Sequence, residues 1–240
     1  MRSFLKIFCR HLKACTLYFW IMTRKLLLQT KWVSLALLTI SFLLIYNPLT
    51  KFPYTFCVII IFILVSTFLQ NGNLKSLNFR NLRSGDIKNI LVSYLVLELS
   101  VDFMIQPLVN WICNEPADYS TFEHIRGDTA QYLKWLYRMW ISAAIGEELL
   151  FRAFAFAQLK NIFGDRKILI VILSALMFSL PHLYQGTAGL IMTFVFGIAF
   201  GFLYIKFKNI WINIIVHGLI DTVFLTLSYL GYIEFYQFIW

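Results

Sequence analysis

Long apolar runs, separated by short charged segments, dominate the sequence. Three stretches hold no charged side chain: residues 32–50, 52–74 and 168–205. Each is a candidate membrane span, because an ionised side chain at the bilayer centre costs about 2.5 to 3.5 kcal/mol. The third stretch is long enough for two helices, with the turn expected near residues 185–187. The pattern predicts an all-α, polytopic transmembrane helical bundle of about seven spans, the others lying near 90–112, 135–159 and 210–230.

Composition agrees with a chain that lies in a membrane. Of the 240 residues, 60% are hydrophobic and 14% are charged, and the mean hydropathy is +0.72. These values exclude a disordered chain, a collagen-like chain and a disulfide-rich secreted domain. The cysteines are scattered without metal-binding or redox spacing, and we interpret them as reduced, small hydrophobic residues: Cys9, Cys15, Cys57 and Cys113.

The positions of the charged residues predict the orientation of the chain. The N-terminal stretch 1–31 contains no acidic side chain, the loop 71–89 is mainly basic, and the loop 114–134 is mainly acidic. Loops rich in Lys and Arg lie on the cytoplasmic side, so the alternation predicts a cytoplasmic N-terminus and an external C-terminus. Most of the net charge of +9 then marks the cytoplasmic face of an integral membrane protein. We therefore expect membrane lipids, and no nucleic acid, as partners of these charges.

The chain divides into four parts. Residues 1–31 form a basic cytoplasmic or interfacial segment, in which Arg24 and Lys25 interrupt the apolar run. An amphipathic interfacial helix is therefore expected over 14–31, in preference to an eighth span. Residues 32–134 contain the N-terminal spans and loops, residues 135–230 contain the spans with unusual ionisable side chains, and residues 231–240 form a C-terminal tail.

Two adjacent glutamates lie within the predicted span 135–159. Glu148 and Arg152 are spaced i, i+4, so they share a helix face and can form an ion pair. Glu147 lies about 100° further round the helix and has no local partner. Because an ionisable residue inside a span is costly unless it has a role, the extra carboxylate indicates a functional site. The alternative is a purely structural charge cluster between helices.

Two later spans contain histidine. His182 follows Pro181, which can kink the helix beside it. His217 and Asp221 are spaced i, i+4 and project from one helix face. Each histidine alone is compatible with a hydrogen-bonded core residue, and Asp221 with a partner that orients His217. Together, carboxylates and imidazoles from three spans could converge to activate a water molecule.

These residues resemble a known family. Glu147-Glu148-x-x-x-Arg152, Phe178-x-x-x-His182 and His217-x-x-x-Asp221, in this order and each in a predicted span, are similar to the three motifs of the CAAX-protease and bacteriocin-processing (CPBP, Abi, type II CAAX prenyl endopeptidase) family of intramembrane proteases. The resemblance covers roughly residues 135–225, and the N-terminal half resembles the family only as apolar spans. It implies an intramembrane endopeptidase in a cell membrane, with a bacterial one favoured, and a peptide or lipidated-protein substrate.

The resemblance also implies roles for the motif residues. Glu147 would be the general base, with His182 completing the activation of water. His217 and Asp221 would stabilise the oxyanion and position the scissile carbonyl, while Glu148 and Arg152 would be a structural pair. An ionised aspartate cannot donate a hydrogen bond to an oxyanion, so two other roles stay open for Asp221, which are orienting His217 and binding a metal.

A metal cofactor is left open by the sequence. Glu147, His182 and His217 resemble the ligand set of a catalytic zinc site, so zinc or another divalent metal is one interpretation. The sequence contains no His-Glu-x-x-His motif, and metal-independent glutamate chemistry is the interpretation we favour slightly. The expected processes are maturation of a bacteriocin or pheromone, self-immunity, or CAAX-type processing.

Two other functions use the same residues. The chain could protect its producer as a bacteriocin immunity protein that binds without proteolysis, or it could be a proton-coupled carrier. Outside the three motifs, Glu98 and Asp102 are spaced i, i+4 in the third span, and we interpret them as structural or water-facing. Gly197 and Gly201 form a Gly-x-x-x-Gly pattern, which favours close packing of helices.

Overall fold

The computed structural model describes residues 28–115 and 120–232. Within these ranges the chain forms helices and turns, and no strand, as an all-α fold requires. The interfacial helix expected over 14–31 and most of the tail 231–240 lie outside the described residues. The principal α-helices are α2 (Lys31–Leu43), α3 (Tyr54–Asn71), α4 (Ser84–Ser100), α5 (Gln106–Cys113), α6 (Thr129–Met139), α7 (Ala155–Phe163), α8 (Lys167–Ser179), α9 (Gly186–Phe207) and α10 (Ile210–Leu230).

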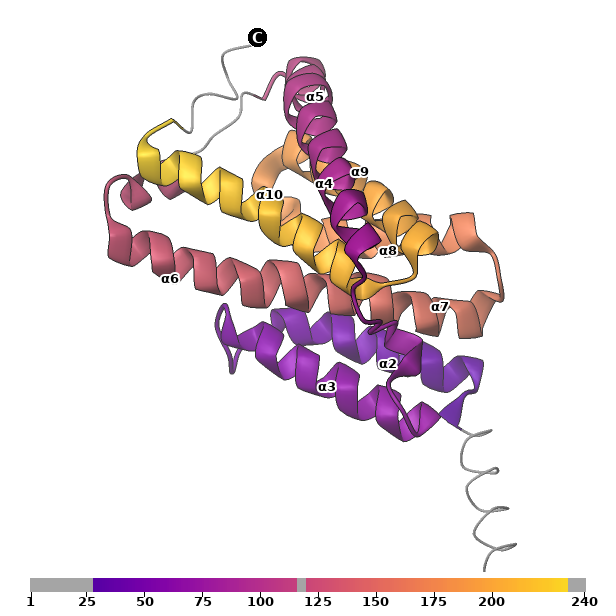
Figure 1. Ribbon diagram of the computed structural model, residues 1–240. Helices are drawn as coiled ribbons and strands as arrows, with labels where there is room; N and C mark the ends of the chain where they lie inside the picture. The colour runs from indigo at the N-terminus through magenta and orange to yellow at the C-terminus, as the bar shows by residue number, and fades with distance from the viewer. Residues whose placement is uncertain (1–27, 116–119, 233–240) are drawn as a thin grey trace, which may run out of the picture.

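One long helical run crosses the centre of the molecule. It starts with α6, continues through the π-helical segment η5 (Trp140–Phe154) and ends with α7, and α6 and α7 lie in line in Figure 1. Helix α3 packs on one side of η5 and α10 on the other, while α2 packs on α7. The central run is therefore enclosed by helices from both halves of the chain.

The main hydrophobic core lies where α3, η5, α8 and α10 meet. Its fully buried side chains include Ile59 and Ile63 from α3, Leu150 and Phe154 from η5, and Ile210 at the start of α10. Gly146 in η5 has the ring of Phe56 against it, so close that a Cβ at this position would lie 2.5 Å from Cδ1 of Phe56. The glycine thus allows α3 to approach the segment that carries the two glutamates.

Some of the seven predicted spans are long enough in the structure to cross a membrane. Among the described residues, four helical stretches are long and apolar enough to cross a membrane: Tyr54–Asn71, Ser84–Cys113, Lys167–Phe207 and Ile210–Leu230. The helix Lys31–Tyr46 is apolar but shorter than these four. The central run α6–η5–α7 is not among the four, and it carries three charged residues close together, Glu147, Glu148 and Arg152. The count of seven spans therefore stays a prediction, as do the positions of the two termini relative to the membrane.

The predicted pair of helices within 168–205 is present, but its turn begins earlier than residues 185–187. Helix α8 ends at Ser179, and the 3-10 segment η6 (Leu180–Gln185) leads into α9. Pro181, which lies at the first turn of η6, lacks the N–H that would continue the α8 hydrogen-bond pattern. The histidine after it therefore lies in the connection, where α8 packs back against α9.

The contact between α8 and α9 yields a stability prediction. A Cβ on Gly197 would lie 2.8 Å from both Cα and Cβ of Ala175, so Gly197→Ala forces the two helices apart. We expect a loss of about 1 to 3 kcal/mol in unfolding free energy, measured as a lower thermal midpoint in detergent. Gly85→Ala is the control, because nothing lies within 4 Å of its Cβ position and alanine favours helix there. Equal midpoints for the two variants would contradict the packing argument.

Candidate active site

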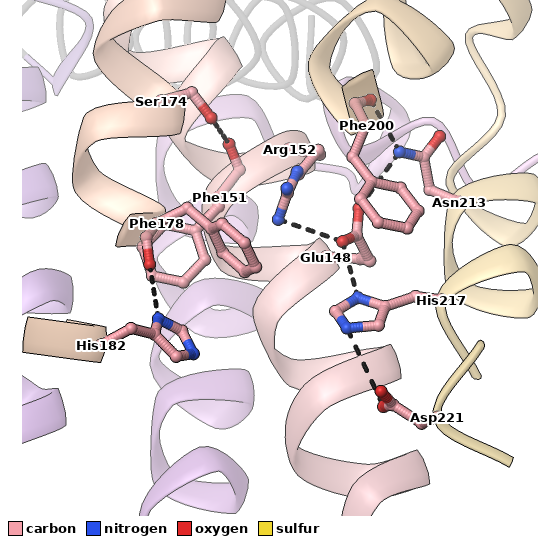
Figure 2. A network of polar contacts seen from close by, with 10 residues as sticks. All are labelled: Glu148, Phe151, Arg152, Ser174, Phe178, His182, Phe200, Asn213, His217 and Asp221. Carbon is pink, nitrogen blue, oxygen red and sulfur yellow. Dashed lines mark hydrogen bonds and ion pairs between the residues drawn. The ribbon is translucent and has the colours of Figure 1, made fainter. Parts of the chain in front are cut away.

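A buried carboxylate lies at the centre of a polar network between η5 and α10 (Figure 2). Glu148 is fully buried, and its Oε1 lies 3.0 Å from Nη1 of Arg152. The same oxygen lies 2.9 Å from Nδ1 of His217, and Oε2 accepts a hydrogen bond of 3.1 Å from Nδ2 of Asn213. Three side chains from two helical segments thus share one carboxylate, which satisfies a charge that would be costly alone.

Arg152 is enclosed between two aromatic rings. Its guanidinium carbon lies 4.2 Å from the ring centroid of Phe178 and 5.2 Å from that of Phe200. Among the described residues its nitrogens have no hydrogen bond in good geometry, so the Glu148 ion pair and the two rings are what stabilise the buried charge.

His217 lies between the two acidic residues of the network. A carboxylate only accepts, so Nδ1 of His217 donates to Glu148 and Nε2 is the nitrogen that faces Asp221. Nε2 lies 3.8 Å from Oδ2 of Asp221, which is beyond hydrogen-bond length. The imidazole stacks on the ring of Phe200, with 5.0 Å between centroids. Its orientation is therefore fixed by Glu148 on one edge and Phe200 on one face.

Glu147 differs from its neighbour. Its side chain is only partly buried, and it forms no hydrogen bond or ion pair with any described residue. Its carboxylate nevertheless interacts electrostatically with His217, Asp221 and Arg152. The sequence pair Glu-Glu thus consists of one carboxylate that is fully bonded inside the bundle and one that is available beside it.

His182 reaches the same region from η6. Its Nδ1 donates to the carbonyl of Phe178 at 2.9 Å, which leaves Nε2 as the free nitrogen. The ring of Phe178 lies 5.3 Å from the His182 ring and 6.4 Å from the His217 ring, measured between centroids. The two histidines therefore border one aromatic ring, and His182 has no direct contact with Glu148 in Figure 2.

The donor set was tested for a metal site. No group of three or more His, Cys, Asp or Glu side chains within residues 28–115 and 120–232 is placed to hold a metal ion. Each histidine uses Nδ1 for a hydrogen bond, His217 to Glu148 and His182 to a carbonyl, so Nε2 is the nitrogen that a metal could bind, and the two Nε2 atoms are not grouped with Glu147 as three ligands. As arranged, Glu147, His182 and His217 do not fit a shared metal, and we derive no chemistry from one.

Comparison with known proteins bears on this geometry. Residues 129–223 match the family model described as type II CAAX prenyl endopeptidase Rce1-like. The match supports membership of the CPBP family. The matched segment runs from the start of α6 into α10 and contains every motif residue described above. No curated protein and no solved structure matches the chain.

The match and the apolar helices agree on the coarse character of the chain. A family of prenyl endopeptidases supports a hydrolase that acts on a peptide or protein, and the candidate spans support an integral membrane protein. The matched segment is also the part of the fold that brings η5, η6 and α10 together.

Several network residues were not found from the sequence. Asn213 bonds Glu148 and also donates to the Phe200 carbonyl at 2.9 Å, although it is not part of a CPBP motif quoted above. Its spacing of i−4 from His217 on α10 was an available signal, because both side chains then share a helix face. Ser174 donates to the carbonyl of Phe151 at 2.6 Å and so connects α8 to η5.

Asn213 provides a second stability prediction. Asn213→Leu removes the donor to Oε2 of Glu148, and losing a hydrogen bond to a buried charge costs about 1.5 to 3 kcal/mol. We expect the thermal midpoint to fall further than in Ser174→Ala, which removes a neutral buried hydrogen bond worth about 1 kcal/mol. Unfolding followed by circular dichroism measures both. If Ser174→Ala is the more damaging change, Glu148 does not depend on the amide.

Proposed function

We propose that the chain is an endopeptidase in which Glu147 activates the attacking water. Glu147 takes a proton from water, the resulting hydroxide attacks the scissile carbonyl carbon, and the same proton passes to the leaving amine as the C–N bond breaks. The observation that carries this proposal is the difference between the two glutamates. Glu148 has ion-pair and hydrogen-bond partners on both oxygens, whereas Glu147 has none among the described residues.

The two histidines have complementary roles in this proposal. His182 has its Nε2 free and its Nδ1 held by a backbone carbonyl, which suits it to orient the water beside Glu147. His217 donates from Nδ1 to Glu148 and presents Nε2 on the side of Asp221. In the protonated imidazolium form, between these two carboxylates, Nε2–H can stabilise the oxyanion. Asp221 then orients His217 and does not contact the oxyanion itself, because an ionised carboxylate cannot donate.

For the substrate, we propose a small or lipid-associated peptide. Cleavage near a lipidated C-terminal tail, as the name of the CAAX family suggests, and maturation of a bacteriocin or pheromone both place an apolar substrate beside membrane helices. Glu147 and His182 are each partly exposed whereas Glu148 is fully buried, which supports a substrate approaching them without opening the Glu148 network.

Matched substitutions of the two glutamates test the mechanism. Glu147→Gln should retain the thermal midpoint and lower cleavage by about 10² to 10⁴-fold, the typical contribution of a general base. Glu148→Gln should instead lower the midpoint, because it disrupts a buried ion pair at a cost of about 3 to 5 kcal/mol. The assay uses purified protein in vesicles with two fluorogenic peptides, one ending in a prenylated CAAX sequence and one unmodified.

The control is Glu123→Gln, which changes a surface carboxylate in the loop before α6 and should affect neither property. Cleavage by Glu147→Gln at the wild-type rate would exclude the mechanism. If Glu147→Gln loses cleavage and still protects producing cells from a bacteriocin as well as wild type does, the chain acts as a non-proteolytic immunity protein.

Chelation tests the metal interpretation separately. Because the described histidines and glutamates do not form a shared metal site, we expect cleavage to persist after treatment with 1,10-phenanthroline and dialysis against EDTA. Elemental analysis of the purified protein should show no stoichiometric zinc. Loss of cleavage on chelation and its return on adding zinc would show instead that Glu147, His182 and His217 rearrange around a metal.

A further inference from the structure

The loop that follows α3 is docked on the turn between α9 and α10. The carbonyl of Asn78 accepts a 3.1 Å hydrogen bond from the backbone N–H of Ile210, and Nδ2 of Asn78 donates to the Tyr204 hydroxyl at 2.7 Å. The ring of Phe79 lies 5.6 Å from that of Trp211. The loop that follows α3 is thus held at the ends of the two C-terminal spans.

This docking gathers basic side chains on one surface. The residues are exposed and come from both segments, and we call them the basic surface: Lys75, Arg80, Arg83, Lys206 and Lys208. The acidic residue within 72–88 and 206–211 is Asp86, and its Oδ2 already accepts from the backbone N–H of Arg83 at the start of α4. Phe79 and Trp211 are each 37% exposed, and Trp211 adds an amphipathic ring of the kind that lies at the headgroup level.

Lys208 has a left-handed backbone conformation that glycine would adopt with less strain. It has φ +49° and ends α9, with its N–H bonded to the carbonyl of Tyr204 at 2.9 Å. Glycine is the usual residue at such a left-handed helix end, because a Cβ is unfavourable there. A lysine at this point places an exposed cation in the turn between α9 and α10 at a conformational cost, and a cost of this type is an indication of function.

We propose that the basic surface binds the phosphate headgroups of anionic phospholipids. Clusters of Lys and Arg directly beside membrane helices attract anionic lipid, and each cation contributes to the attraction. The surface lies on the segments that continue into the core, since Leu77, Tyr204 and Ile210 pack with Leu149 and Leu150 of η5. Lipid held here therefore stabilises the contact of α9 and α10 with the helix that carries both glutamates.

Reconstituted full-length protein tests this proposal. Wild type and Lys208→Gly are placed in nanodiscs of phosphatidylcholine, with or without phosphatidylglycerol, and thermal midpoints and co-purified lipid are measured. Wild type should show a higher midpoint with phosphatidylglycerol and should retain that lipid. Lys208→Gly should be at least as stable as wild type in phosphatidylcholine, because strain is relieved, yet should retain about fivefold less phosphatidylglycerol. Adding Lys206→Gln should extend the loss to about twentyfold.

The matched control is Arg166→Gln with Lys167→Gln, which removes two exposed charges from the turn between α7 and α8. It should respond to phosphatidylglycerol as wild type does. An equal loss in this control would show that only total charge matters and would overturn the proposal, as would an unchanged response in Lys208→Gly with Lys206→Gln. If that variant instead loses peptide cleavage equally in both lipid compositions, the surface binds substrate and not lipid.

Discussion

The buried carboxylate of Glu148 is the constraint around which the rest of this molecule is arranged. A charge in the interior of a membrane bundle is tolerated only when its oxygens are bonded, and here the partners are Arg152 on its own helix and His217 and Asn213 on α10. The network therefore fixes the rotation of α10 against η5. It also engages Nδ1 of His217, so a structural requirement leaves Nε2 as the nitrogen available for chemistry.

The π-helical form of η5 belongs to the same arrangement. π-helical segments are rare in proteins, and those that occur are often found at functional sites. Here the segment contains both glutamates and Arg152. Close approach on its two sides depends on glycine. Gly146 admits Phe56 from α3, and Gly218 on α10 admits the Trp140 ring, with a Cβ position only 2.6 Å from Cη2. Helices from both halves of the chain therefore reach the polar network.

Much of this was predictable from the sequence, and the reasons for the exceptions are physical. Uncharged runs located α3 and the α8–α9 pair, because the cost of burying charge is large and local, and the apolar segment near 210–230 located α10 despite Asp221. The i, i+4 rule predicted the proximity of Glu148 to Arg152 and of His217 to Asp221. The rule could not predict that His217 lies closer to Glu148 than to Asp221, because this depends on how two helices rotate against each other. The hydrogen bond from Asn213 to Glu148 was not predicted, because it depends on the same rotation. The number of spans was not fixed either, because it depends on where the bilayer lies relative to the helices.

The ring of Phe178 lies among three functional side chains. The guanidinium of Arg152 lies over the Phe178 ring, and the same ring contacts the rings of His182 and His217. The ring thus lies between the fully buried ion pair and the partly exposed His182. If His182 orients the water as we propose, one aromatic side chain shields a permanent charge pair from the water that the reaction consumes.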